Sequence, residues 1–194
     1  MFAVKKNILI ILTLTILCVL MLSKYLPSPT YKNPDILQKA QQFEDASVEI
    51  SPIKTQVVET IKELSKAFSN YEKKELLEAL SITYAENAFL NDRIHSVSGK
   101  KAILDYFEGT FEKIQQAEFR FLDSAYETKG VYVRWVMRLQ FRENQEFFEF
   151  LGVSHLRFNK EAKIIYHQDF WDFSELMAEI RFLKTFVNLA KSNA

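Results

Sequence analysis

The second half of the chain contains four strand-like runs in succession, near residues 117–127, 131–142, 146–158 and 163–172. The second run, "VYVRWVMRLQF", alternates apolar and polar residues. Its apolar face consists of Val131, Val133, Trp135, Met137, Leu139 and Phe141. Such alternation predicts a strand with one face on a hydrophobic core. Four such runs in succession predict a curved, mostly antiparallel sheet.

Helical periodicity dominates the segment before these strands. Ser51 followed by Pro52 is a typical helix start. The expected apolar faces are Val57, Ile61, Leu64 and Phe68 in a first helix, Leu76, Leu77 and Leu80 in a second, and Ile103, Tyr106, Phe107 and Phe111 in a third that follows Gly99. A C-terminal helix is expected to carry Leu176, Ile180, Leu183 and Val187, with Asp172 and Glu175 as its capping pair. Helices followed by strands predict an α+β fold with helices on one face of the sheet.

The N-terminus carries an uncharged apolar run, Ile8–Leu22, preceded by Lys5 and Lys6. The run is shorter than the roughly 20 residues of a comfortable membrane-spanning helix, and it overlaps the length of signal-peptide cores. No Ala-x-Ala pattern follows it, which favours an uncleaved signal anchor over residues 1–24. A cleaved signal and a buried soluble helix remain the alternatives. Lys5 and Lys6 predict a cytoplasmic N-terminus, one pass through the inner membrane and an extracytoplasmic C-terminal domain.

Prolines are frequent in the stretch that follows the apolar run. Residues 25–51 are therefore predicted to form a linker, in which Pro34 starts one short helix at most. A single domain is expected over residues 52–194.

The charge balance and the motif content exclude several classes of function. Lysine plus arginine equal aspartate plus glutamate at 25 each, so nucleic-acid binding has no electrostatic support. Cys18 is the only cysteine and cannot form an internal disulfide. There is no phosphate loop, no Gly-x-Ser-x-Gly and no Cys-x-x-Cys, so no cofactor is expected. No metal site is expected either, because His155 should lie on the opposite strand face from Ser154 and point away from His167.

Several stretches together resemble the SnoaL-like, nuclear-transport-factor-2-like superfamily. They are "LSITYAENAFLND", "SGKKAILDYFE", the Trp-bearing central strand and "KIIYHQDFWD". The resemblance covers roughly residues 52–173, and it is strongest with bacterial members that end in His-x-Asp-aromatic-Trp-Asp before a helix. It implies a cone-shaped α+β fold. It implies little about function, because this fold hosts isomerases, cyclases, hydrolases, dehydratases and non-catalytic binding modules.

Comparison with ketosteroid isomerases places their catalytic base on Asp92 and their last-strand Trp on Trp171. Their oxyanion-hole tyrosine would fall on Phe68, the supporting tyrosine on Phe107 and the protonated Asp on Ser154. An enolate needs strong donors, and a phenylalanine cannot donate. Ketosteroid isomerase chemistry is therefore not expected.

Comparison with limonene-type epoxide hydrolases places their water-positioning or acid carboxylate on Asp169. Their Arg-x-Asp pair on the central strand would fall on Trp135 and Met137, neither of which can orient water. That catalytic triad is therefore broken as well.

Both comparisons place the face formed by His167, Asp169 and Trp171 on the concave side, where this fold has its pocket. The predicted lining is Phe68, Phe107, Trp135, Met137, Ser154, His167 and Trp171, with Asp92 and Asp169 as acidic groups and catalytic candidates. For Asp92 the alternative is an aspartate that binds neighbouring backbone amides. For Asp169 the alternative is a structural pair with His167, two residues along on the same strand face.

Three functions remain open from the sequence. The first is a membrane-anchored accessory module that binds a small hydrophobic ligand, and the second is an acid–base enzyme that uses Asp92 and Asp169. The third is an envelope scaffold, because type IV secretion machines use singly anchored domains of this superfamily. The outward face of residues 146–158 carries Phe147, Leu151 and Val153 among charged residues. This face predicts a homodimer contact. The C-terminal helix is a second candidate surface, either for dimerisation or for closing the mouth of the pocket.

Overall fold

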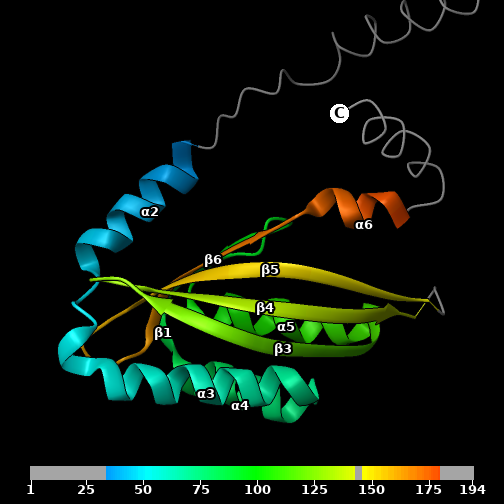
Figure 1. The fold of residues 1–194 in the computed structure, drawn as a ribbon, viewed down its shortest axis with the longest axis horizontal. Coiled ribbons are helices and arrows are strands. Elements are labelled where there is room, and N and C mark those ends of the chain that lie inside the picture. Colours follow the sequence, from blue (N-terminus) through cyan, green and yellow to red (C-terminus); the bar gives the residue numbers. More distant parts are fainter. Residues whose placement is uncertain (1–33, 143–145, 180–194) are drawn as a thin grey trace, which may run out of the picture. The chain divides into compact units, whose positions relative to one another are not determined.

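The computed structural model describes residues 34–142 and 146–179 (Figure 1). The chain divides into two compact units, residues 1–39 and 40–194. The predicted anchor and the predicted helix beyond residue 179 lie outside the described residues. Within the described ranges, no helix has both the length and the apolar character needed to cross a membrane.

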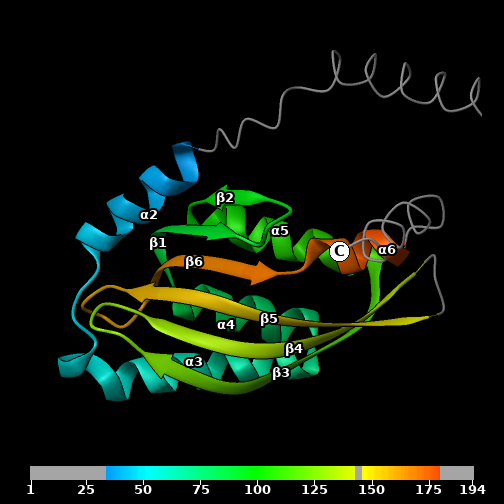
Figure 2. The ribbon, with the colours of Figure 1, turned by 45° about the horizontal axis from the view of Figure 1, so that its top comes forward.

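Six strands form one sheet. They are β1 (Tyr84–Asn91), β2 (Ser96–Ser98), β3 (Ile114–Tyr126), β4 (Val131–Phe141), β5 (Phe147–Phe158) and β6 (Ile164–Trp171), in the spatial order β2-β1-β6-β5-β4-β3 (Figure 2). Every neighbouring pair is antiparallel except β1 and β6, which run parallel. The predicted mostly antiparallel sheet is confirmed. The parallel pairing sets β1 and the residues after it beside β6.

Three helices cover one face of this sheet (Figures 1 and 2). They are α3 (Lys54–Asn70), α4 (Lys73–Thr83) and α5 (Lys100–Lys113), and a short 3-10 turn, Ser51–Ile53, precedes α3. Helix α3 packs on β3, whereas α4 and α5 pack on β1. Gly99, with φ of 89°, starts α5, and its amide donates to Ala88 O at 2.7 Å. An L-residue rarely adopts this φ, which accounts for the glycine.

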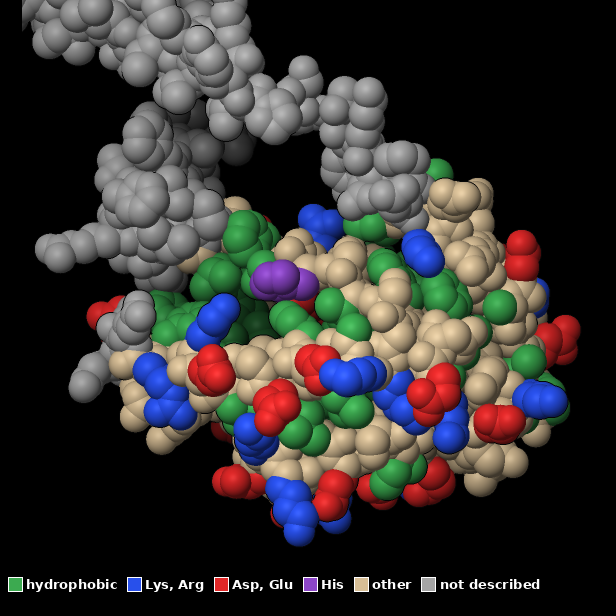
Figure 3. Space-filling view, turned by 180° about the vertical axis from the view of Figure 1, so that it is seen from behind, with side chains coloured by type: hydrophobic (Ala, Val, Ile, Leu, Met, Phe, Trp, Pro, Cys, Tyr) green, Lys and Arg blue, Asp and Glu red, His purple; other side chains and the backbone are tan. Residues whose placement is uncertain are grey.

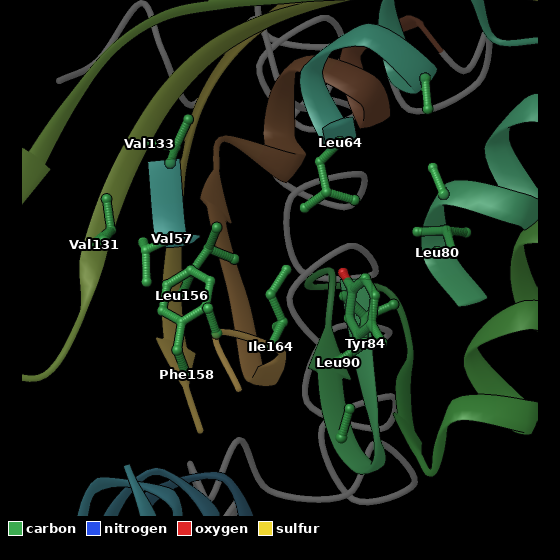
Figure 4. Close-up of a cluster of buried hydrophobic side chains, with 14 of the residues drawn as sticks. Val57, Leu64, Leu80, Tyr84, Leu90, Val131, Val133, Leu156, Phe158 and Ile164 are labelled. Carbon is green, nitrogen blue, oxygen red and sulfur yellow. The ribbon is translucent and has the colours of Figure 1, made fainter. Parts of the chain in front are cut away.

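The main core lies between the helices and this sheet face (Figure 4). Its fully buried members include Val57, Leu64, Leu80, Tyr84, Leu90, Val131, Val133, Leu156, Phe158 and Ile164. Val57, Leu64, Leu80, Val131 and Val133 belong to the predicted apolar faces of helices and of a strand. Burial of each large apolar side chain contributes about 1.5–3 kcal/mol relative to exposure.

The segment predicted as a linker contains α2 (Pro34–Ala46). Phe43 is buried on the opposite sheet face, where its ring lies 6.1 Å from Phe89 and 5.9 Å from Tyr166. Val48 and Ile50 then donate to the backbone oxygens of Phe158 (3.1 Å) and Thr128 (2.8 Å). These contacts join the end of the predicted linker to the sheet.

At the other end of the described chain, α6 (Phe173–Glu179) begins the predicted C-terminal helix. Asp172 caps it, because its carboxylate accepts the Ser174 amide at 2.8 Å and its carbonyl accepts the Glu175 amide at 3.1 Å.

Candidate functional site

A cavity of about 610 Å³ opens between the inner face of the sheet and helices α3 and α5. All nine residues that the sequence placed in the pocket line this cavity: Phe68 of α3, Phe107 of α5, Trp135 and Met137 of β4, Ser154 of β5, His167, Asp169 and Trp171 of β6, and Asp92 after β1. Most other lining residues are aromatic or aliphatic. The back view shows a recess with hydrophobic side chains beside an exposed histidine (Figure 3). The function of these nine residues stays a prediction.

Strand register explains why the polar residues meet at one place on the cavity wall. Asp169 of β6 is directly opposite Ser154 of β5, and His167 precedes it by two residues on the same strand face. Trp135 of β4 is opposite Gly152, two residues before Ser154 on β5. A Cβ atom at Gly152 would lie 2.2 Å from the Trp135 ring, so the glycine makes room for the indole.

Asp169 belongs to a hydrogen-bonded network built on one of its two oxygens. Its Oδ1 accepts the Ser154 hydroxyl at 2.5 Å and lies 2.8 Å from His167 Nε2. Trp135 Nε1–H donates to Ser154 Oγ at 2.8 Å. On the other side of the imidazole, His167 Nδ1 is bonded to the hydroxyl of Tyr84, which has no exposed surface. The predicted His167–Asp169 pair is therefore present, and Ser154 and Tyr84 bind it directly.

The hydroxyl of Tyr84 fixes the positions of the protons in this network. A buried phenol must donate its proton, and His167 Nδ1 is the partner that the described structure offers. We infer that Nδ1 accepts this proton, which assigns the neutral tautomer to the imidazole and makes Nε2–H the donor to Asp169. Burial, followed by the charge of Asp169, raises the pKa of Tyr84 well above its ordinary value, so the phenol keeps its proton.

Asp92 sits in a turn and has both oxygens engaged. Oδ1 accepts the amides of Ile94 (2.9 Å) and His95 (2.6 Å), while Oδ2 accepts the hydroxyl of Tyr106 from α5. Trp171 Nε1–H donates to the Asp92 backbone oxygen at 2.8 Å. The bonds to backbone amides are those expected for an aspartate that shapes its own turn.

Tyr106 is held as a donor by its surroundings. Burial, then the charge of Asp92 and then the hydrogen bond to it, raise the pKa of Tyr106 well above its ordinary value. Tyr71 shows the same trend on a smaller scale, because burial raises its pKa while the hydroxyl of Thr110 at 2.6 Å acts in the opposite direction. Neither phenol is positioned to act as an acid near neutral pH.

The wall that would correspond to an oxyanion hole is apolar. Phe68 and Phe107 pack edge to face with their ring centroids 5.5 Å apart. Neither ring can donate to a developing negative charge. The described hydrogen bond of nearby Tyr106 goes to Asp92.

The described residues contain no group of three or more His, Cys, Asp or Glu side chains that could hold a metal ion. His155 lies on the outer sheet face, where its ring stacks on Tyr132 and its Nε2 lies 2.9 Å from Glu127. Burial comes first among the causes that lower the pKa of His155.

The sequence did not single out Tyr84, Tyr106 or Tyr71 as part of the site. Tyr106 was recognised only as a member of an apolar helix face, although its hydroxyl reaches Asp92 from the next element. Tyr84 reaches His167 because β1 runs parallel to β6, a pairing that periodicity does not predict. A buried tyrosine needs a hydrogen-bond partner, and this general rule was the one usable signal.

Comparisons with known proteins agree with this architecture. A family model described as a SnoaL-like domain matches residues 64–167. No curated protein matches the chain at the sequence level.

Solved structures that resemble the chain come from several bacteria. A putative SnoaL-like polyketide cyclase from Jannaschia sp. CCS1 is 16% identical, with a TM-score of 0.57 over 65% of this chain and 92% of that one. A hypothetical protein with a ketosteroid isomerase-like fold from Catenulispora acidiphila, in complex with trimethylamine, is 16% identical, with a TM-score of 0.55 over 62% and 91%. An epoxide hydrolase from M. tuberculosis, described as LEH-like, is 8% identical, with a TM-score of 0.54 over 70% and 97%. At these identities the likeness shows the fold alone.

The family match spans more than half of the chain, and the structural neighbours share its helices and curved sheet. Polyketide cyclases, isomerases and hydrolases occur among proteins of this fold. The chain therefore belongs to the SnoaL-like domain family, and its fold is similar to that of solved nuclear-transport-factor-2-like proteins.

Proposed function

We propose that this domain binds a small apolar molecule in the cavity between the sheet and helices α3 and α5. The observation that carries the proposal is a cavity of about 610 Å³ with a mostly aromatic and aliphatic lining. In its wall lies the carboxylate of Asp169, whose two described hydrogen bonds both end on Oδ1. Pockets that bind small molecules have this composition, with an apolar wall and a few fixed polar groups that orient the ligand. The role fits an accessory or carrier domain.

Two neighbouring residues of β4 allow a matched test. Met137 lines the cavity, whereas Val136, the next residue along the strand, is opposite Leu151 on the outer face. Met137→Trp should fill the cavity and weaken binding of 1-aminoanthracene, a neutral fluorescent probe, by at least about tenfold. Val136→Trp adds the same side chain outside and should leave the affinity unchanged. Equal affinities in the two variants would show that the probe binds elsewhere.

An acid–base enzyme is the second candidate, and one observation favours it. Asp169 Oδ1 is fixed by Ser154 and His167, so its carboxylate is aligned toward the cavity as a general base would be. Asp92, the other candidate, has both oxygens bonded within the protein. Turnover of a small epoxide or of a β,γ-unsaturated ketone should then fall about 10²–10⁴-fold in Asp169→Asn. A comparable rate in that variant would remove Asp169 from the chemistry.

We further propose that residues 8–22 anchor the protein in the inner membrane, with the domain on the extracytoplasmic side. The uncharged run and the lysines before it support this arrangement. The full-length protein should sediment with membranes and resist carbonate extraction. Recovery of a mature chain that starts near residues 24–30 would identify a cleaved signal instead.

The outer face of the sheet supports a proposed homodimer. Leu151 is 56% exposed, Phe170 49% and Phe147 42%, and all three lie on the same outward face of the sheet. Exposed apolar side chains that gather on one face mark interaction sites. Leu151→Lys should lower the sedimentation coefficient toward that of a monomer if this face is the contact. Ile82→Lys, at an exposed apolar side chain of helix α4 away from this face, is the control for added charge.

A further inference from the structure

The charged groups around the cavity are mostly negative. Asp92, Asp105, Glu112 and Asp169 line it, and Lys113 is the one lysine or arginine among the described lining residues. Asp105 is exposed and pairs with Lys101 at 2.6 Å, so its charge is balanced. Glu112 and Lys113 carry opposite charges, so together they add nothing to the net charge of the lining. The charges left are those of the two aspartates bonded within the cavity wall.

His167 does not cancel the charge of Asp169. The buried Tyr84 hydroxyl donates to Nδ1, which leaves the imidazole neutral and its single proton on Nε2. If the imidazole were protonated, its Nδ1–H would face the hydroxyl of Tyr84. That hydroxyl would then have no described acceptor for its own proton. The network of Tyr84, His167, Ser154 and Asp169 therefore carries one net negative charge.

The second oxygen of Asp169 is the part of this network left for a ligand. Both described bonds of the carboxylate end on Oδ1, and no described side chain bonds Oδ2. The side chain is only 16% exposed and lines an apolar cavity. A charge in such surroundings is costly unless a group of opposite sign approaches it.

Hydrogen-bond donors in the cavity interior are already used by the protein. The indole N–H groups of Trp135 and Trp171 bind Ser154 and the Asp92 carbonyl. The hydroxyl of Tyr106 binds Asp92. Tyr71 and Thr110 bond one another, and Thr110 also donates to the Phe107 carbonyl at 2.6 Å. Apart from His95 and Lys113, the described lining side chains offer an anion no free N–H or O–H group.

The aromatic rings supply the remaining contact that a cation requires. Trp171 and Phe150 lie with ring centroids 5.4 Å apart, and Trp135 and Phe119 lie 6.1 Å apart. All four line the same cavity as Asp169. Ring faces attract positive groups, and tryptophan does so most strongly.

Building on the proposed function, we propose that the cavity selects cationic apolar ligands, namely small amines or quaternary ammonium ions. The positive group lies beside Asp169 Oδ2, and the hydrocarbon part lies against the aromatic wall. Neutral ligands of the same size bind more weakly, and carboxylates are rejected.

Three probes of nearly equal size test this selectivity: benzylammonium, benzyl alcohol and benzoate. The affinity of each is measured by competition with 1-aminoanthracene for the full-length protein at pH 7. Benzylammonium should bind at least about tenfold more tightly than benzyl alcohol, and benzoate at least about tenfold more weakly. Benzyltrimethylammonium, which has no N–H, should keep the advantage over benzyl alcohol, because charge rather than hydrogen bonding is recognised.

Two variants locate the charge. Asp169→Asn should abolish the preference for benzylammonium while benzyl alcohol still binds, which also shows that the cavity is intact. Asp105→Asn removes the same charge from the exposed rim and should leave the preference unchanged. An equal loss in both variants would overturn the assignment to Asp169.

The outcomes separate the two proposals. Equal affinity for the three probes, or a preference for benzoate, would overturn cation selection and leave apolar binding standing. Failure of every probe, 1-aminoanthracene included, to bind the wild-type protein would overturn apolar binding and cation selection together.

Discussion

Asp92 and Asp169 line the same cavity but are held in different ways. Asp92 follows β1 in a turn, and three donors bind its two oxygens: two backbone amides and the hydroxyl of Tyr106. Asp169 lies within a strand, and both of its donors are side chains that share one oxygen. A carboxylate whose acceptors are satisfied by its own turn shapes the backbone. One that keeps an oxygen for the cavity is available to a ligand.

The two tryptophans of the cavity differ in the same way, in their contacts with these aspartates and in their burial. Trp135 supports the Asp169 network through Ser154, is 4% exposed and lies over Gly152. Trp171 contacts Asp92 only through the backbone oxygen and is partly exposed. The indole that supports the Asp169 network is therefore more deeply buried than the indole that contacts Asp92.

The largest expected effect is on stability and concerns these indoles. Trp135→Ala should lower the free energy of unfolding by roughly 3–5 kcal/mol, the usual cost of removing a buried aromatic side chain. Trp171→Ala should cost less, because part of its surface already faces solvent. Urea unfolding of both variants gives the comparison. A loss below about 1 kcal/mol for Trp135→Ala would mean that the inner face of β4 is not packed as described.

A smaller loss is expected at the turn. Asp92→Ala removes the acceptor of two amides and one phenol and should cost about 1–3 kcal/mol. Asp92→Asn keeps an oxygen for the amides and should recover most of that loss. The same unfolding measurement applies, and a neutral Asp92→Ala would contradict the structural role given to this carboxylate.

The tyrosines beside the two aspartates should make the free energy of unfolding depend on pH in the alkaline range. The pKa of Tyr106 is raised by burial and by Asp92, so above pH 10 the unfolded chain releases a proton that the folded protein keeps. Stability present below pH 10 is therefore lost as the pH rises above it. Tyr106→Phe should flatten this decline by up to about 1.4 kcal/mol per pH unit, measured by urea unfolding between pH 9 and 11. Tyr84 contributes in the same direction, so part of the decline should remain. An unchanged slope would show that the phenol of Tyr106 is not buried beside Asp92.

Much of this architecture is predictable from the sequence because burial leaves a periodic pattern. The alternation in "VYVRWVMRLQF" places Trp135 and Met137 on the cavity face, and both line the cavity. The bond between Asp169 and His167 follows from their spacing on one strand.

Other features depend on sheet order and on contacts between elements, which periodicity does not contain. The parallel pairing of β1 with β6 brings Tyr84 to His167. In the same way α5 carries Tyr106 to Asp92, although the two are 14 residues apart. Phe43 is buried on the outer face of the sheet, although the composition of its helix gave little reason to expect burial.

The smallest expected effect on stability is that of Asp169→Asn. The amide oxygen of an asparagine can accept from Ser154 and from His167 Nε2–H as Oδ1 does now, so both bonds survive. With a neutral imidazole no ion pair is broken, and the free energy of unfolding should change by less than about 1 kcal/mol. If His167 were instead charged, the change would break a buried ion pair and cost about 3–5 kcal/mol. Thermal and urea unfolding decide between these values, and Ser154→Ala, which removes one of the two donors to Oδ1, is the matched control. A large loss together with unchanged probe binding would make Asp169 a structural residue like Asp92 and end the distinction between them.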